Sequence, residues 1–246
     1  MNFFAFYSLC LLLATGFYRV QAQEIAAADS STAAAVRAAT QRYHAATLAD
    51  SRLLSGTDYV NRTKPYVQGS PFFPVSEVQL GSVRYDGFAY AAVPMRYDCQ
   101  RDQLVVQPPG RAISLQLVPE KVATFTLAGH RFVRLVTDSV ANPQVRTGFY
   151  DLLVDGPARL LARHHKKSYE RPTPAGMEGH FEQTTRYVVQ HHDAYYPVTR
   201  LKDVLAAFPD QKAALQKFVR KQHLSFGEGL RQYSLTALVG YYNTLR

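Results

Sequence analysis

Histidine is the residue type in this sequence whose grouping most suggests chemistry. Five of the eight histidines fall within one stretch, and they are His164, His165, His180, His191 and His192. Imidazole is a common ligand of transition metals, and ligands can come from neighbouring strands of one sheet. Adjacent residues on a strand point to opposite faces, so each adjacent pair can offer one imidazole to a shared site. One histidine from each of the three positions could therefore converge on a metal ion, although nothing in the spacing requires it.

Other signs of catalysis are weak. The sequence contains no HExxH, CxxC or GxSxG pattern. Ser82 falls in a predicted strand rather than at a strand-to-helix turn, and Cys99 is followed by Gln100 without the flanking residues of a cysteine hydrolase. A nucleophile therefore cannot be assigned.

Carboxylates are numerous enough to suggest a glycosidase-type pair. The candidates are Asp86, Asp98, Asp102, Asp151 and Asp155. They fall mainly at predicted strand ends and hairpins, where aspartate commonly supports turns. We accordingly predict no catalytic residue, no metal ligand and no cofactor, and we keep the histidine cluster as the alternative.

The densest basic run, residues 163–167, has the sequence RHHKK, and Arg220-Lys221 forms a second patch. Either could contact an anionic lipid or glycan, with tyrosines as platforms for sugars; these are Tyr169, Tyr187, Tyr195 and Tyr196. In an alternating strand only half of the run shares a face. The simpler interpretation, which we favour, is an edge strand protected by charge.

The elements that would position these residues begin after a leader. Residues 1–22 are predicted to be a cleavable signal peptide, with an uncharged apolar run over 3–16 and small side chains at Val20 and Ala22. The run is too short to span a bilayer stably. No Lys or Arg precedes it, so an uncleaved anchor or a buried N-terminal helix remains the alternative. Cys10 lies deep within the run and is not placed for lipidation.

The composition after the leader is that of a folded, basic protein. The chain is 47% hydrophobic and 12% aromatic, with a formal net charge of +9. Loss of the leader removes only Arg19 from that charge, because residues 1–22 hold no other charged side chain. A basic surface attracts polyanions, and export argues against nucleic acid as the partner. Cys99 then has no second cysteine with which to form an internal disulfide.

Three regions follow the leader. Residues 23–75 are predicted to form an Ala-rich helix and a connecting arm rich in Gly and Pro. Residues 76–200 are predicted to form an antiparallel β domain, because short runs of Val, Tyr, Phe and Leu recur between turn signals such as Asp86-Gly87 and Asp155-Gly156. A β-sandwich or a curved meander is expected. The predicted strands are 77–85, 88–97, 102–107, 112–118, 121–128, 131–137, 147–155, 158–166, 181–190 and 194–199.

Two further features complete this plan. The segment 167–179 holds two Pro and two Gly, which predicts an exposed loop that interrupts the sheet. After residue 200 the apolar period changes from two to about 3.6, which predicts three amphipathic helices. Residues 201–246 are expected to form a helical cap on the β domain.

Three motifs carry a resemblance. They are GSVRYDG at 81–87 with VPMRYD at 93–98, TGFYDLLVDG at 147–156, and YYN at 241–243. In these the chain resembles a group of exported bacterial proteins of unknown function, over roughly residues 50–246. The resemblance implies an exported β-rich protein with a helical tail and transfers no site residue.

These observations predict a non-enzymatic envelope or secreted protein, periplasmic or released, that binds another envelope component. The expected partner is an anionic envelope component or another envelope protein, and no integral membrane segment is expected after leader cleavage. The alternative is a hydrolase or metal-dependent enzyme acting on a glycan or peptide through His164 or His165, His180, and His191 or His192.

The leader can be tested directly. Expressed in a bacterium with its leader, the exported chain should begin at Gln23, because the small residues at 20 and 22 direct cleavage after Ala22. The intact mass of the exported protein measures this. Mature protein that retains Met1, or that stays in the cytoplasm, would contradict the prediction.

Overall fold

In the computed structural model the chain divides into two units, residues 1–47 and 48–246. The structure describes residues 52–108, 110, 112–137 and 145–245, and in the first unit Thr32, Ala35, Val36 and Ala39, which are helical and exposed. The predicted leader, most of the Ala-rich helix and Cys10 lie outside the described residues. None of the helices in the described part of the chain has the length and apolar character needed to cross a bilayer.

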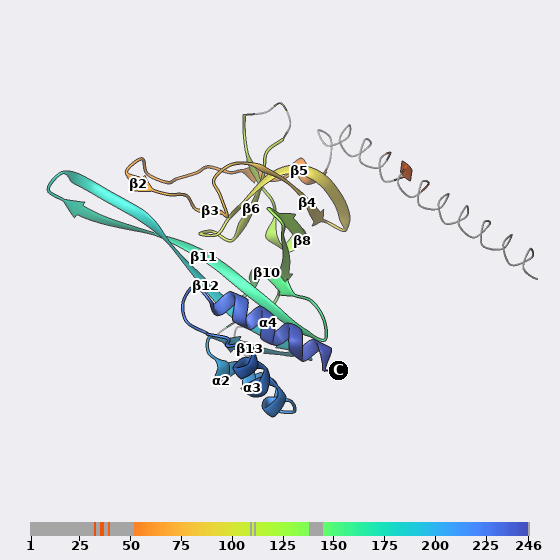
Figure 1. Ribbon diagram of the computed structural model, residues 1–246. Coiled ribbons are helices and arrows are strands. Elements are labelled where there is room, and N and C mark those ends of the chain that lie inside the picture. Colours follow the sequence, from red (N-terminus) through yellow and green to blue (C-terminus); the bar gives the residue numbers. More distant parts are fainter. Residues whose placement is uncertain are drawn as a thin grey trace, which may run out of the picture. The chain divides into compact units, whose positions relative to one another are not determined.

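In the described part of the second unit, thirteen strands form one sheet, and Figure 1 shows how its longer strands are arranged. Its main path runs β1-β7-β6-β5-β4-β8-β9-β10-β11-β12-β13, while β2 joins β12 and β3 joins β5. The first strands are β1 (Thr57–Asp58), β2 (Val67–Gln68), β3 (Phe72–Phe73), β4 (Gln79–Tyr85), β5 (Phe88–Asp98), β6 (Gln103–Val106) and β7 (Leu115–Gln116). The others are β8 (Val122–Leu127), β9 (His130–Leu135), β10 (Gly148–Val154), β11 (Ala158–Thr173), β12 (Gly176–His191) and β13 (Ala194–Val198). Short 3-10 turns lie at η2 (Arg52–Leu54) and η3 (Pro119–Lys121).

The predicted fold class is confirmed, because the described chain is mainly β with helices at its C-terminal end. Strands β4 to β7 form one antiparallel meander and β8 to β13 form another, and pairing of β4 with β8 joins them. At that junction Gly81 is needed, since a Cβ there would lie 2.1 Å from the carbonyl oxygen of Thr126. The Asp86-Gly87 turn between β4 and β5 has positive φ angles of 51° and 84°, as a tight hairpin requires.

Two predictions about irregular segments are wrong. Residues 167–179 are not an interrupting loop, because β11 and β12 each run for 16 residues and pair as far as Thr173 and Gly176. Pro172 is tolerated because no further strand pairs with β11 beside it in the described sheet. Gly179 marks a close approach, since a Cβ there would lie 2.9 Å from a methyl carbon of Val67 on β2.

The connecting arm is also more regular than predicted. Its short strands β1, β2 and β3 pair with β7, β12 and β5 respectively. Phe72 and Phe73 anchor it, with exposed fractions of 2% and 6%. Burial of two aromatic side chains thus outweighs the Gly and Pro that disfavour regular structure.

The helical cap consists of α2 (Leu201–Ala207), α3 (Lys212–Lys221) and α4 (Arg231–Thr244). Helix α4 packs along β11, and α2 packs on β12 and β13 (Figure 1). A buried apolar cluster joins the cap to the sheet, and it includes Ala158, Leu160, Val189, Val198, Val204, Phe208, Leu215, Leu235, Leu238 and Val239.

The C-terminal YYN motif attaches the cap to the start of β11. Asn243 accepts a hydrogen bond from the backbone N–H of Ala158 through Oδ1 and donates one to the Ala158 carbonyl through Nδ2, both at 2.9 Å. A Cβ at Gly156 would lie 2.6 Å from Nδ2 of Asn243, so the DG and YYN motifs depend on each other. The Tyr242 hydroxyl lies 3.1 Å from Nε2 of His191.

Replacing Asn243 with Ala should destabilise the fold by about 2 kcal/mol, because two polar backbone groups of a buried residue lose their partners. Asn243→Asp keeps the acceptor but places a carboxylate oxygen against the carbonyl oxygen of Ala158, so its cost should be at least as large. Urea unfolding measures both variants. A change below about 0.5 kcal/mol for Asn243→Ala would show that the cap does not depend on this contact.

Candidate functional site

The histidines singled out from the sequence are spread along the β11–β12 hairpin. His164 pairs with Thr185, His180 with Tyr169, and His191 with Ala158. The rows of His180 and His191 are eleven residues apart, which corresponds to about 36 Å of strand. Among the described residues no group of three His, Cys, Asp or Glu side chains could hold a metal ion. The convergence that the metal-site alternative needs does not occur.

The two central histidines, His164 and His165, lie on opposite faces of β11 and have different surroundings. His164 is 6% exposed, with Nε2 at 3.4 Å from Oδ2 of Asp151 and Nδ1 at 3.1 Å from the Thr185 hydroxyl. His165, on the opposite face of β11, has Nδ1 at 3.2 Å from the carbonyl oxygen of Cys99.

The outer histidines lie toward the ends of the hairpin. His180 is exposed and lies 3.3 Å from Glu182. His191 is buried in the cap with Nδ1 at 3.2 Å from the carbonyl of Ala207, and His192 occupies a turn with a φ of 52°. These three histidines therefore serve a strand surface, the cap and a turn.

The predicted carboxylate pair is likewise divided among separate roles. Asp86 is part of a turn, and exposed Asp155 forms ion pairs with Arg131 and Arg159. Buried Asp98 organises the β5–β6 turn by accepting hydrogen bonds from the N–H groups of Gln100 and Arg101 and from the Tyr59 hydroxyl.

Asp151 is buried on β10, at 2.6 Å from Nδ1 of His130. This contact and the one with His164 place the carboxylate between two imidazoles. Asp102 lines one cleft, and Asp98 lines a second hollow beside it.

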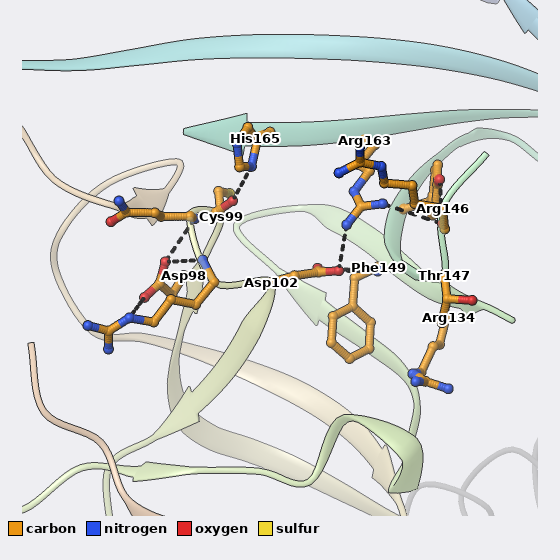
Figure 2. Close-up of polar contacts among 12 residues, drawn as sticks. Asp98, Cys99, Asp102, Arg134, Arg146, Thr147, Phe149, Arg163 and His165 are labelled. Atoms are coloured by element: carbon orange, nitrogen blue, oxygen red, sulfur yellow. Dashed lines mark hydrogen bonds and ion pairs between the residues drawn. The ribbon is translucent and has the colours of Figure 1, made fainter. Parts of the chain in front are cut away.

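The arginine cleft lies where the β5–β6 turn, the segment before β10 and the β11–β12 hairpin meet (Figure 2). It has a volume of about 330 Å³. Four arginines and one carboxylate line it, together with polar and apolar side chains; the lining is Gln100, Arg101, Asp102, Arg146, Tyr150, Arg163, His165, Thr184, Arg186 and Val188.

Strand register explains which residues of the basic run enter the arginine cleft. Arg163 and His165 are two residues apart on β11 and share a face, and they pair with Arg186 and Thr184 on β12. His164 and Lys166 point to the other face. Lys166 donates to the carbonyl of Phe72, and its partial burial lowers the pKa of the ammonium group. Alternation therefore divides the run as the sequence predicts.

Asp102 holds several groups of the arginine cleft together through its carboxylate. Its Oδ2 accepts a hydrogen bond from Nη2 of Arg163 at 3.0 Å, and Oδ1 accepts one from the Tyr97 hydroxyl at 2.6 Å. The backbone N–H of Phe149 also donates to this carboxylate, at 3.3 Å from Oδ1. Gly148 makes room for the group, because a Cβ there would lie 2.0 Å from Oδ2. Figure 2 shows Arg163 directed at Asp102 from the hairpin above it.

The charges of the arginine cleft are not balanced. Arg163 has Asp102 as its ion-pair partner. Arg146 and Arg186 are exposed, and neither forms an ion pair with a carboxylate in the described part of the chain. Since four arginines face one aspartate, the lining carries a formal charge of +3 with His165 neutral.

The side chains around the arginine cleft favour binding over covalent chemistry. Burial raises the pKa of the Cys99 thiol and of the Tyr97 and Tyr150 hydroxyls, so all three stay protonated at neutral pH. Cys99 is 2% exposed, as expected for a buried structural cysteine. Guanidinium groups, a threonine hydroxyl and an imidazole remain to contact a ligand, and arginine matches carboxylate or phosphate oxygens in a bidentate geometry.

A second hollow of about 240 Å³ adjoins the arginine cleft through Gln100 and Arg101. There the Lys64 ammonium is 2.7 Å from Glu170, and the Tyr66 hydroxyl donates to the same carboxylate. Because its lysine is already paired, this hollow is a weaker candidate than the arginine cleft.

Sequence reasoning missed most of the arginine cleft. Arg101, Arg146 and Arg186 lie far apart in sequence from one another and outside the basic run. The TGFYDLLVDG motif was one sequence feature that belongs to the cleft, because its Gly148 lies in close contact with the Asp102 carboxylate. Its role depends on a close approach that only the folded chain reveals.

Replacing Gly148 with Ala should destabilise the protein by about 2 kcal/mol or more, because the new methyl group would displace Asp102 from Phe149 and Arg163. Urea unfolding measures the effect. Gly129→Ala is the matched control: its φ of 79° is also positive, but a Cβ there has no atom within 4 Å. The control should cost about 1 kcal/mol from backbone strain alone. Equal costs for the two variants would contradict the contact with Asp102.

Comparison of the chain with protein-family models, with curated proteins and with solved structures gave no match. The function is therefore argued from the arginine cleft itself, in which four exposed or half-buried arginines surround the half-buried carboxylate of Asp102.

Proposed function

We propose that this chain is a non-enzymatic exported protein that binds an anionic envelope component in the arginine cleft. The observation that carries the proposal is the arrangement of Arg146, Arg163 and Arg186 around one cleft that contains a single carboxylate, Asp102. Asp102 holds Arg163 in place and leaves the other two guanidinium groups open to a ligand.

Electrostatics support a bound anion. Like charges gathered in one concave site repel each other, and a cleft lined by one sign of charge concentrates ions of the opposite sign. The positive lining is therefore stabilised when an anion enters. The planar guanidinium forks also give geometric selection, since each can bind two oxygens of one oxyanion.

A binding role fits better than hydrolysis. The strongest acid–base arrangement in the described residues is the contact between half-buried His130 and buried Asp151. The same carboxylate oxygen also contacts His164, whose ring stacks on Phe73 with centroids 4.5 Å apart. Asp151 is thus part of a packed interior. This arrangement does not favour the alternative, a hydrolase or metal-dependent enzyme that acts on a glycan or peptide.

The cellular setting of the proposal comes from the sequence. A leader at residues 1–22 would deliver the chain to the periplasm or the medium, where anionic lipids, glycans and phosphates are available. The resemblance to exported bacterial proteins is consistent with this destination. The partner is accordingly an anionic envelope component rather than nucleic acid.

The test uses two double variants that remove the same charge. Arg146→Ala with Arg186→Ala should weaken co-sedimentation with bacterial envelope fragments at least tenfold, because the two open guanidinium groups are lost. Arg220→Ala with Lys221→Ala removes two exposed cations from α3 and should change it less than about twofold. Urea unfolding of both variants checks that they remain folded.

Two outcomes would overturn the proposal. The first is equal loss in both double variants, which would mean that diffuse positive charge drives the binding. The second is wild-type protein that does not sediment with envelope fragments even at low ionic strength, where screening is weakest.

A further inference from the structure

We infer that the ligand of the arginine cleft is a phosphate monoester dianion, and that it binds together with a proton on Nε2 of His165. The inference rests on the proposed function and specifies its ligand. It follows from the tautomer of one histidine and from the directions of the donors around the cleft.

The hydrogen bond of His165 determines its tautomer. Nδ1 lies 3.2 Å from the carbonyl oxygen of Cys99, and a carbonyl can only accept, so Nδ1 carries a proton. In the neutral ring Nε2 is then an unprotonated acceptor, which repels an oxyanion. In the imidazolium form Nε2 becomes a donor and carries part of a positive charge. An anion beside this ring therefore favours the second proton.

The charged groups that face His165 come from every element around it. On β11 these are Arg163 and Lys167, and on β12 they are Glu182 and Arg186. The β5–β6 turn contributes Arg101, Asp98 and Asp102, with the protonated thiol of Cys99, and the segment before β10 contributes Arg146. Asp98 and Asp102 are occupied by hydrogen bonds within the protein, and the carboxylate of Glu182 lies 3.3 Å from Nε2 of His180. A bound dianion would thus be the negative group next to Nε2 that is not already engaged.

The directions of the donors favour a tetrahedral oxyanion over a carboxylate. Arg163 and Arg186 lie side by side on paired strands, Arg146 comes from the segment before β10, and Thr184 adds a hydroxyl beside His165. A carboxylate offers its lone pairs in one plane, whereas phosphate offers three terminal oxygens in different directions. Two negative charges on phosphate also compensate the lining better than one.

Sulfate is the sharpest probe because it is a tetrahedral dianion whose charge does not change between about pH 8 and about pH 5.5, the range in which histidines commonly titrate. By isothermal titration calorimetry, wild-type protein should bind sulfate about tenfold more tightly at the lower pH. His165→Gln should remove most of this pH dependence. His180→Gln replaces an exposed histidine outside the arginine cleft and should leave it unchanged.

The ligand class is tested with three further probes at constant pH. Glycerol phosphate should bind at least tenfold more tightly than acetate. Vesicles of phosphatidylcholine containing phosphatidic acid, a monoester, should bind more tightly than vesicles containing phosphatidylglycerol, a diester, if the phosphate belongs to a lipid. Binding of glycerol phosphate without vesicle binding would assign the site to a soluble phosphate monoester.

Three results would overturn the inference: sulfate affinity that does not change with pH, pH dependence that survives His165→Gln, or acetate that binds as tightly as glycerol phosphate. Each is separate from failure of the proposed function. If the cleft variants still lose envelope binding while these probes fail, the arginine cleft binds an anion of another class.

Discussion

The carboxylate of Asp102 is the group on which both the fold around the arginine cleft and its charge depend. It receives hydrogen bonds from Tyr97 on β5, from the backbone of Phe149 on β10 and from Arg163 on β11. These strands belong to the two different meanders of the sheet. A single anion therefore joins two parts of the sheet and orients one of the arginines. Hydrogen bonds to charged groups are about twice as strong as neutral ones, which suits this role.

The β11–β12 hairpin carries this arrangement because its alternation separates two environments. One face presents Arg163 and His165 to the arginine cleft, while the other places His164 against Asp151 and directs Lys166 to the carbonyl of Phe72. At its far end the hairpin is held by Asn243, which binds both backbone groups of Ala158. The cap therefore fixes the position at which β11 starts and supports the register that aligns Arg163 with Arg186.

Local sequence patterns predicted most strands and helices correctly, but they did not predict the segments that contain Gly and Pro. The ten predicted strands correspond to β4 through β13, and three predicted helices correspond to α2, α3 and α4, because period and turn residues are local signals. Residues 167–179 were misassigned since Pro172 and Gly179 disfavour strands in isolation. Their cost depends on neighbours: Pro172 lies beside no further strand, and Gly179 meets Val67. Such relations span about a hundred residues and leave no local pattern.

The same difference explains why the basic run was recognised and the arginine cleft was not. Alternation predicted that only half of residues 163–167 would share a face, and that division is present. It could not predict Arg146 or Arg101, which reach the site through a loop and a turn. The alternative histidine site required residues from three positions along one hairpin to lie close together. The register shows that these positions are far apart, because an extended strand rises about 3.3 Å per residue.

The presence of Asp102 in a cleft that we propose to bind anions is explained by a competition between charge and position. Removing its negative charge would raise the formal charge of the lining from +3 to +4, a gain that solvent and salt screen at a half-exposed site. The same change would weaken the contact that holds Arg163 and the contacts to Tyr97 and Phe149, each worth about 1.5 to 3 kcal/mol when one partner is charged. An arginine that must be ordered at each binding event also costs up to about 2 kcal/mol of side-chain entropy. Position therefore outweighs charge, and a carboxylate within the cleft is compatible with the proposed binding of an anion.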